Sequence, residues 1–240
     1  MRTSINPLLL WGKRLLIYIL GVFLMAIAAV LSARSSLGVG PVNSLGNVLY
    51  QVGRSAGAPA YINLGNCTTA VFCLYMFTEY ILLLREFRPA MLLQIVASLL
   101  FGQFVNLASL MLAGLPSPDN YAMQMLYLLV SIPFVSGGIM FYLAPNLIAM
   151  PSEGLCLALS RRTGLHLGTI KTIFDCTVVL LSVAVSLLYF KTLVGVREGT
   201  VISALLVGTV FRLLQKCFQK PLLRFVERDQ EQRASEDAAT

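Results

Sequence analysis

The 240-residue chain is 57% hydrophobic and only 12% charged, with a formal net charge of +7. Soluble domains carry about 25% charged residues, so the composition excludes a protein that covers itself with a polar surface in water. The basic residues flank apolar segments, where they set membrane topology. The sequence therefore predicts a protein whose partner is the lipid bilayer and not nucleic acid.

Six apolar segments are long enough to cross a bilayer as helices. About 20 apolar residues, at a rise of about 1.5 Å per residue, span the hydrocarbon layer. The first segment is longer than the apolar core of a signal peptide and further spans follow it, which favours a retained helix. The predicted fold class is all-α, a polytopic membrane helix bundle with about six transmembrane helices, approximately residues 15–33, 61–84, 89–112, 121–143, 169–190 and 200–218.

Two more apolar segments, residues 41–52 and 151–161, are too short to span the membrane. Each begins with proline, which suits the first turn of a helix and ends the preceding one. They are predicted to be short helices that re-enter the membrane or lie at its surface. Residues 221–240 are polar with mixed charge and are predicted to form a disordered cytoplasmic tail.

The two halves of the chain show an internal repeat. Residues 41–45 align with residues 151–155, and Asn66-Cys67-Thr68 aligns with Asp175-Cys176-Thr177. We predict a first membrane repeat over residues 1–115 and a second over 116–220, each with three spans and one short broken or re-entrant helix. Because three is odd, the halves would insert in opposite orientations, which is a transporter architecture. A duplicated bundle with no transport role is the alternative.

The distribution of basic residues predicts how the chain lies in the membrane. With the N-terminus inside, the inner segments hold most of the lysines and arginines, while Arg34, Arg54 and Lys191 oppose this bias. The positive-inside rule then predicts cytoplasmic N- and C-termini in a bacterial inner (plasma) membrane. The inner basic residues are Arg2, Lys13, Arg14, Arg85, Arg88, Arg161, Arg162, Lys216, Lys220 and Arg224.

Polar residues inside the predicted spans indicate a binding site. A charged side chain at a helix centre costs about 2.5–3.5 kcal/mol on insertion scales, so Lys171 and Asp175, four residues apart, are expected to pair. The repeat places Asn66 opposite Asp175, with Asn63 one turn away. Alternatively, Lys171 lies near the cytoplasmic end of its helix and only extends its charged group to the membrane surface. Glu79 lies near a helix end and is also predicted to lie at the membrane surface.

The glycine-rich stretch before Pro41 gives a second indication of a site. A helix that starts at Pro41 leaves its first N–H groups free at the positive end of its dipole, which can receive an anion. A tight turn with no ligand is the alternative. The predicted substrate-binding residues are Gly38, Gly40, Pro41, Asn43, Ser44, Asn63, Asn66, Ser152, Glu153, Lys171 and Asp175.

No enzymatic constellation is present in the sequence. It has neither a G-x-x-x-x-G-K phosphate loop nor a G-x-S-x-G nucleophile elbow. The single histidine, His166, cannot build a metal site, and the five cysteines are interpreted as packing residues. We therefore expect no enzyme activity, no cofactor and no metal.

Three short motifs resemble the YczE/YitT-type family of bacterial integral membrane proteins. Residues 37–41 (LGVGP) look like that family's LGxGP element after the first helix, and residues 164–169 (GLHLGT) look like its helix entry. Residues 198–208 (EGTVISALLVG) look like its GT-x-x-x-ALL-x-G element in the last helix. The resemblance implies a multi-pass bacterial membrane protein.

Together these features predict a secondary transporter or exporter of a small organic solute, with an anionic solute as one option. Asp175 is the predicted proton- or ion-coupling group. Two alternatives stay open: a non-transporting membrane scaffold or partner protein, and a substrate-capturing subunit of a multi-component importer. The sequence also leaves a homo-oligomer open.

Overall fold

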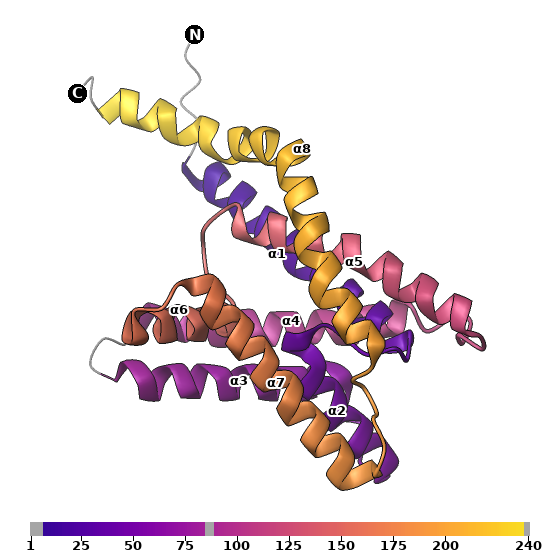
Figure 1. Cartoon of the computed structure of the whole chain (residues 1–240). Helices are drawn as coiled ribbons and strands as arrows, with labels where there is room; N and C mark the ends of the chain where they lie inside the picture. Colours follow the sequence, from indigo (N-terminus) through magenta and orange to yellow (C-terminus); the bar gives the residue numbers. More distant parts are fainter. Residues whose placement is uncertain (1–6, 85–88, 238–240) are drawn as a thin grey trace.

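The computed structural model describes residues 7–84 and 89–237, and side chains within residues 11–84 and 91–218 together with Leu222. Several basic residues used above to predict orientation, among them Arg2, Arg85 and Arg88, lie outside the described residues. Six of the described helices are long and apolar enough to cross a membrane, as the sequence predicts: Trp11–Arg34, Leu64–Leu83, Leu93–Met111, Tyr121–Leu143, Leu167–Phe190 and Glu198–Phe218. In the element numbering of Figure 1, the corresponding helices are α1 (Pro7–Arg34), α3 (Leu64–Leu83), α4 (Leu93–Met111), α5 (Tyr121–Leu143), α7 (Leu167–Phe190) and α8 (Glu198–Asp237).

The two short helices predicted from their starting prolines are present as α2 (Pro41–Ser55) and α6 (Pro151–Thr163). Each follows a spanning helix, α1 or α5, and precedes two more. A 3-10 turn, η1 (Pro89–Leu92), leads into α4. The chain order of a span, a short helix and two spans therefore occurs twice.

Beyond residue 221 the structure differs from the predicted disordered tail, because α8 continues as helix to Asp237. The final segment is rich in Glu, Gln and Arg, which have high helix propensity. Its polarity indicated that it does not enter the membrane core, but polarity does not prevent a helix from forming.

Helices α1 and α5 pack closely against each other and run antiparallel (Figure 1). They cross where Gly21 faces Gly138, close enough for backbone to touch backbone. Helix α4 packs against α1, and α8 packs against α5. The short helices pack crosswise, with α2 against α7 of the other half and α6 against α3.

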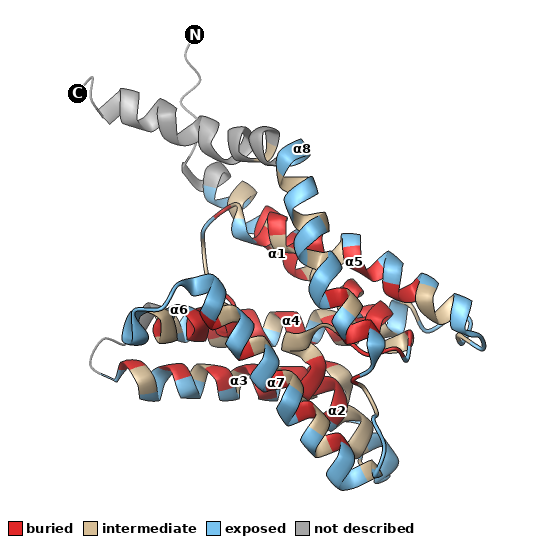
Figure 2. Cartoon of the chain, viewed as in Figure 1, coloured by how far each residue is buried: buried red, intermediate tan, exposed pale blue. Residues whose placement is uncertain are grey.

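The outward faces of the spanning helices are apolar and exposed. Leu16, Leu110, Leu188 and Leu205 are among the large side chains that remain 65–75% accessible, and Figure 2 shows exposed residues along the outside of α3, α5, α7 and α8. Apolar faces of this extent are stable only where lipid covers them. The chain is an integral, multi-pass membrane protein.

Candidate functional site

A cavity of about 320 Å³ lies between the starts of the two short helices. Both halves of the chain line it, with residues from all six spanning helices and from both short helices. Most of its wall is apolar, including Met25, Phe72 and Phe101. The polar side chains that line it are Ser32, Asn43, Ser131, Ser152, Glu153, Lys171, Asp175 and Ser203.

The start of α2 presents backbone to this cavity through Gly40 and Pro41. Gly40 provides no side-chain cap for the helix, and Pro41 occupies the first turn. Pro41 has no N–H, and the Asn43 N–H donates to the Gly40 carbonyl. The Val42 N–H is therefore the donor left without an intrahelical acceptor at the positive end of the helix dipole. The Oδ1 atom of Asn43 is buried and has no hydrogen-bond partner. This end of α2 can accept a polar ligand group.

The start of α6 enters the same cavity from the other half of the chain. Ser152 and Glu153 line it, and the Ser152 hydroxyl donates to Glu153 Oε2 over 2.9 Å. As in α2, no side chain caps the helix and a proline opens it. The carboxylate of Glu153 in the first turn offsets part of the positive end of the α6 dipole.

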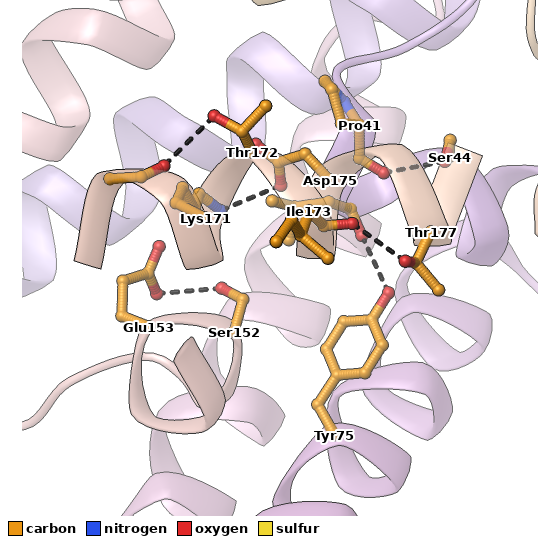
Figure 3. A network of polar contacts seen from close by, with 12 residues as sticks. Pro41, Ser44, Tyr75, Ser152, Glu153, Lys171, Thr172, Ile173, Asp175 and Thr177 are labelled. Atoms are coloured by element: carbon orange, nitrogen blue, oxygen red, sulfur yellow. Dashed lines mark hydrogen bonds and ion pairs between the residues drawn. The ribbon is translucent and has the colours of Figure 1, made fainter. Parts of the chain in front are cut away.

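Lys171 and Asp175 complete the polar part of the cavity from α7 (Figure 3). The Lys171 Nζ lies 3.1 Å from Asp175 Oδ1, the ion pair that their spacing of four residues predicts. The Lys171 Nζ also lies 5.4 Å from the centre of the Phe174 ring. Figure 3 shows Glu153 and Ser152 below the pair and Pro41 above it.

The ion pair lies partly at the surface of α7. The side chains of Lys171 and Asp175 remain 35% and 27% exposed, while the paired atoms Lys171 Nζ and Asp175 Oδ1 are themselves shielded. Among the described residues α7 has little contact with α8, whereas the corresponding helices α3 and α4 pack closely. Packing between α7 and α8 is therefore looser than packing between α3 and α4.

Four of the predicted substrate-binding residues do not line the cavity: Gly38, Ser44, Asn63 and Asn66. Gly38 has a φ of +103°, and a side chain there would meet the start of α8, so it serves the packing of that turn. The Ser44 hydroxyl lies 2.8 Å from that of Ser182 and joins α2 to α7. Asn63 caps α3 by accepting from the Asn66 N–H.

The expectation that Asn66 faces Asp175 is not met. Asn66 is exposed at the start of α3, where its amide donates to the carbonyl of Tyr61 and accepts from Asn106. Asp175 instead lies more than two turns inside α7. The sequences around Asn66 and Asp175 align, but α3 begins at Leu64 whereas α7 begins at Leu167. Asn66 therefore lies at the start of its helix and Asp175 well inside its own.

Comparison with protein-family models shows to which family the chain belongs. The model of a family of unknown function, DUF6198, matches residues 12–216. The chain belongs to this family. The match covers both short helices and all but the outermost residues of the six spans of this DUF6198 protein. It leaves the resemblance to YczE/YitT-type proteins as a prediction. No curated protein and no solved structure matches the chain.

One polar pair of this DUF6198 protein escaped the sequence interpretation. Glu79, expected at the membrane surface, is only 2% exposed and contacts Gln94 of α4. The available signal was a carboxylate in one span and an amide in the next, but the sequence contains no information on whether those helix faces meet.

Proposed function

We propose that the protein is a secondary transporter or exporter of a small organic solute with an anionic or zwitterionic group. The observation that carries the proposal is the Lys171–Asp175 ion pair in a cavity of about 320 Å³ between two half-helix starts. Small-molecule sites have volumes of about 300–1,000 Å³, apolar walls and a few convergent polar groups. Charged residues at membrane depth commonly mark substrate or ion pathways.

The charges of the cavity support a mechanism that couples solute to an ion. An anionic solute that binds Lys171 would take the position of Asp175, whose carboxylate would then lack its partner in a poorly hydrated site. Such a carboxylate is strongly disfavoured unless it takes up a proton or a cation. Binding of the anion and of the positive ion would thus favour each other, and the mostly apolar wall would hold the rest of the solute.

The crosswise packing supports an inverted repeat, with residues 1–115 and 116–220 in opposite orientations. Helix α1 runs antiparallel to its counterpart α5, and each short helix packs on the third element of the other half. In transporters of this kind one half rocks against the other around a central site. We place both termini in the cytoplasm of a bacterial cell, as the basic residues predict, and we propose no enzymatic role.

Ligand-dependent thermal stability tests the site. Detergent-purified protein is heated with a panel of carboxylates, phosphates and zwitterions, and a ligand at 100 times its Kd should stabilise the native state by about 2.7 kcal/mol. Lys171→Met should abolish the shift. Lys191→Met, which removes the same charge at the other end of α7, should retain it. If no compound shifts the wild-type protein, or if both variants behave alike, the site is not the one proposed.

Transport itself is then measured with the identified ligand in liposomes. Asp175→Asn should lose accumulation driven by a pH or Na⁺ gradient and keep exchange of labelled for unlabelled ligand. Unchanged gradient-driven accumulation would remove Asp175 from the coupling role. Wild-type protein that binds the ligand but moves none of it would favour a non-transporting role.

A further inference from the structure

A second polar pair is buried on the opposite side of α6 from the central cavity. Glu79 of α3 and Gln94 of α4 are 2% and 5% exposed. The Gln94 Nε2 atom donates to Glu79 Oε1 over 3.4 Å. Both side chains contact the bare backbone of Gly154, in the first turn of α6, where a methyl group would lie 2.7 Å from Glu79 Oε2.

Two oxygens of this pair have no hydrogen-bond donor. Glu79 Oε2 and Gln94 Oε1 are both shielded from solvent and both unpartnered. They lie 2.7 and 3.0 Å from the same point, the methyl position at Gly154, so they are neighbours. A buried acceptor without a donor is strongly unfavourable, and a carboxylate oxygen is more so than an amide oxygen.

Among the described residues, none supplies a balancing positive charge at contact distance from Glu79. Helices α2, α4 and α6 pack against α3, and among the described residues the charged group that acts on Glu79 is Arg161 of α6, which is itself exposed. The neighbouring α4 residue, Gln94, is neutral. Arg85, Glu86 and Arg88 lie outside the described residues.

We propose that Glu79 carries a proton in the resting protein and forms a cyclic acid–amide pair with Gln94. The Glu79 hydroxyl at Oε2 would donate to Gln94 Oε1, while Gln94 Nε2 donates to Glu79 Oε1. A protonated carboxyl is one donor and one acceptor, and an amide matches it with an acceptor and a donor. One added proton thus satisfies both unpartnered oxygens and removes the buried charge.

The position of the Glu79–Gln94 pair suggests how the proton could reach it and what loss of the proton would change. A separate cavity of about 260 Å³ is lined by Glu79, Gln94, Gly154 and Arg161, so it leads from the buried pair towards an exposed arginine. Gly154 follows Glu153, which lines the central cavity. Loss of the proton would put a carboxylate against the first turn of α6 and change the field at the central site. This coupling rests on the proposed transport function, whereas the protonated pair does not.

Infrared spectroscopy of the full-length protein in liposomes tests protonation directly. At neutral pH the wild type should show the C=O band of a protonated carboxyl, shifted in D₂O. Glu79→Gln, which has nearly the same shape as the acid, should lose that band and keep the thermal stability of the wild type. Asp175→Asn should leave the band unchanged. Absence of an acid band from the wild type at neutral pH would overturn the proposal, whatever the variants do.

A sodium titration separates a proton site from a cation site. The wild-type melting temperature at fixed pH should not change when Na⁺ replaces choline. A Na⁺-dependent rise that Glu79→Gln abolishes would overturn the proton assignment. With a transported solute in hand, Glu79→Gln should slow pH-driven uptake at least tenfold and leave solute binding unchanged. An acid band in a protein that transports nothing would retain the proton site and reject the transport function.

Discussion

Substitution of Gly138 by alanine tests the contact that joins the two halves of the molecule. A methyl group at Gly138 would lie 2.8 Å from the Gly21 carbonyl oxygen, 2.8 Å from the Met25 nitrogen and 2.6 Å from the Met25 Cγ. Two of these atoms are backbone and cannot rotate away. Ordinary contact begins near 3.4 Å, so α1 and α5 must separate by about 0.6 Å at their crossing.

The neighbouring glycine provides a matched control. Gly137 lies on the same helix, and a methyl group there would meet nothing within 4 Å. Overpacking of a tight contact costs about 1–3 kcal/mol, while replacing a helical glycine by alanine gains about 0.5–1 kcal/mol. Gly138→Ala should therefore lose about 1–2 kcal/mol, and Gly137→Ala should be neutral or slightly stabilising.

Thermal unfolding in detergent measures the difference. For a chain of about 150–250 residues, 1 kcal/mol corresponds to about 2–4 °C, so the melting temperature of Gly138→Ala should fall by about 2–8 °C. Gly137→Ala should stay at or above the wild-type value. Equal melting temperatures for the two variants would show that α1 and α5 do not cross at this glycine.

Two further predictions concern the anchoring of α2 and the orientation of the chain. Ser182→Ala removes the 2.8 Å contact with Ser44 and should lower the stability of the folded protein by about 0.5–1.5 kcal/mol. The control Thr177→Ala, whose hydroxyl donates to its own helix, should have no effect. Equal losses of thermal stability in the two variants would contradict a specific contact between α2 and α7. In a variant without its five native cysteines, Ser55→Cys at the end of α2 should react with a membrane-impermeant maleimide in intact cells. Thr163→Cys at the end of α6 should react only after permeabilisation. The reverse labelling pattern would invert the proposed topology.

Much of the fold could be predicted from the sequence because its determinants are local. Bilayer thickness fixes the length of a spanning helix, so hydropathy alone located all six spans. Pro41 and Pro151 marked the starts of α2 and α6 because proline fits the first turn of a helix and interrupts one elsewhere. The Lys171–Asp175 pair was also predictable, since residues four apart share a helix face.

Only the tertiary structure decided which polar groups meet. It brings Pro41 and Glu153 to one cavity with Asp175, although they come from different helices, and it leaves Asn66 at a helix end. It also buries Glu79 against Gln94. Apolar side chains do not select helix neighbours inside lipid as they do in water, because lipid solvates them equally well. Helices become neighbours where small residues let their backbones approach closely, as Gly21 and Gly138 do where α1 crosses α5. Such a contact depends on two segments that are far apart in the sequence, so neither segment alone predicts it.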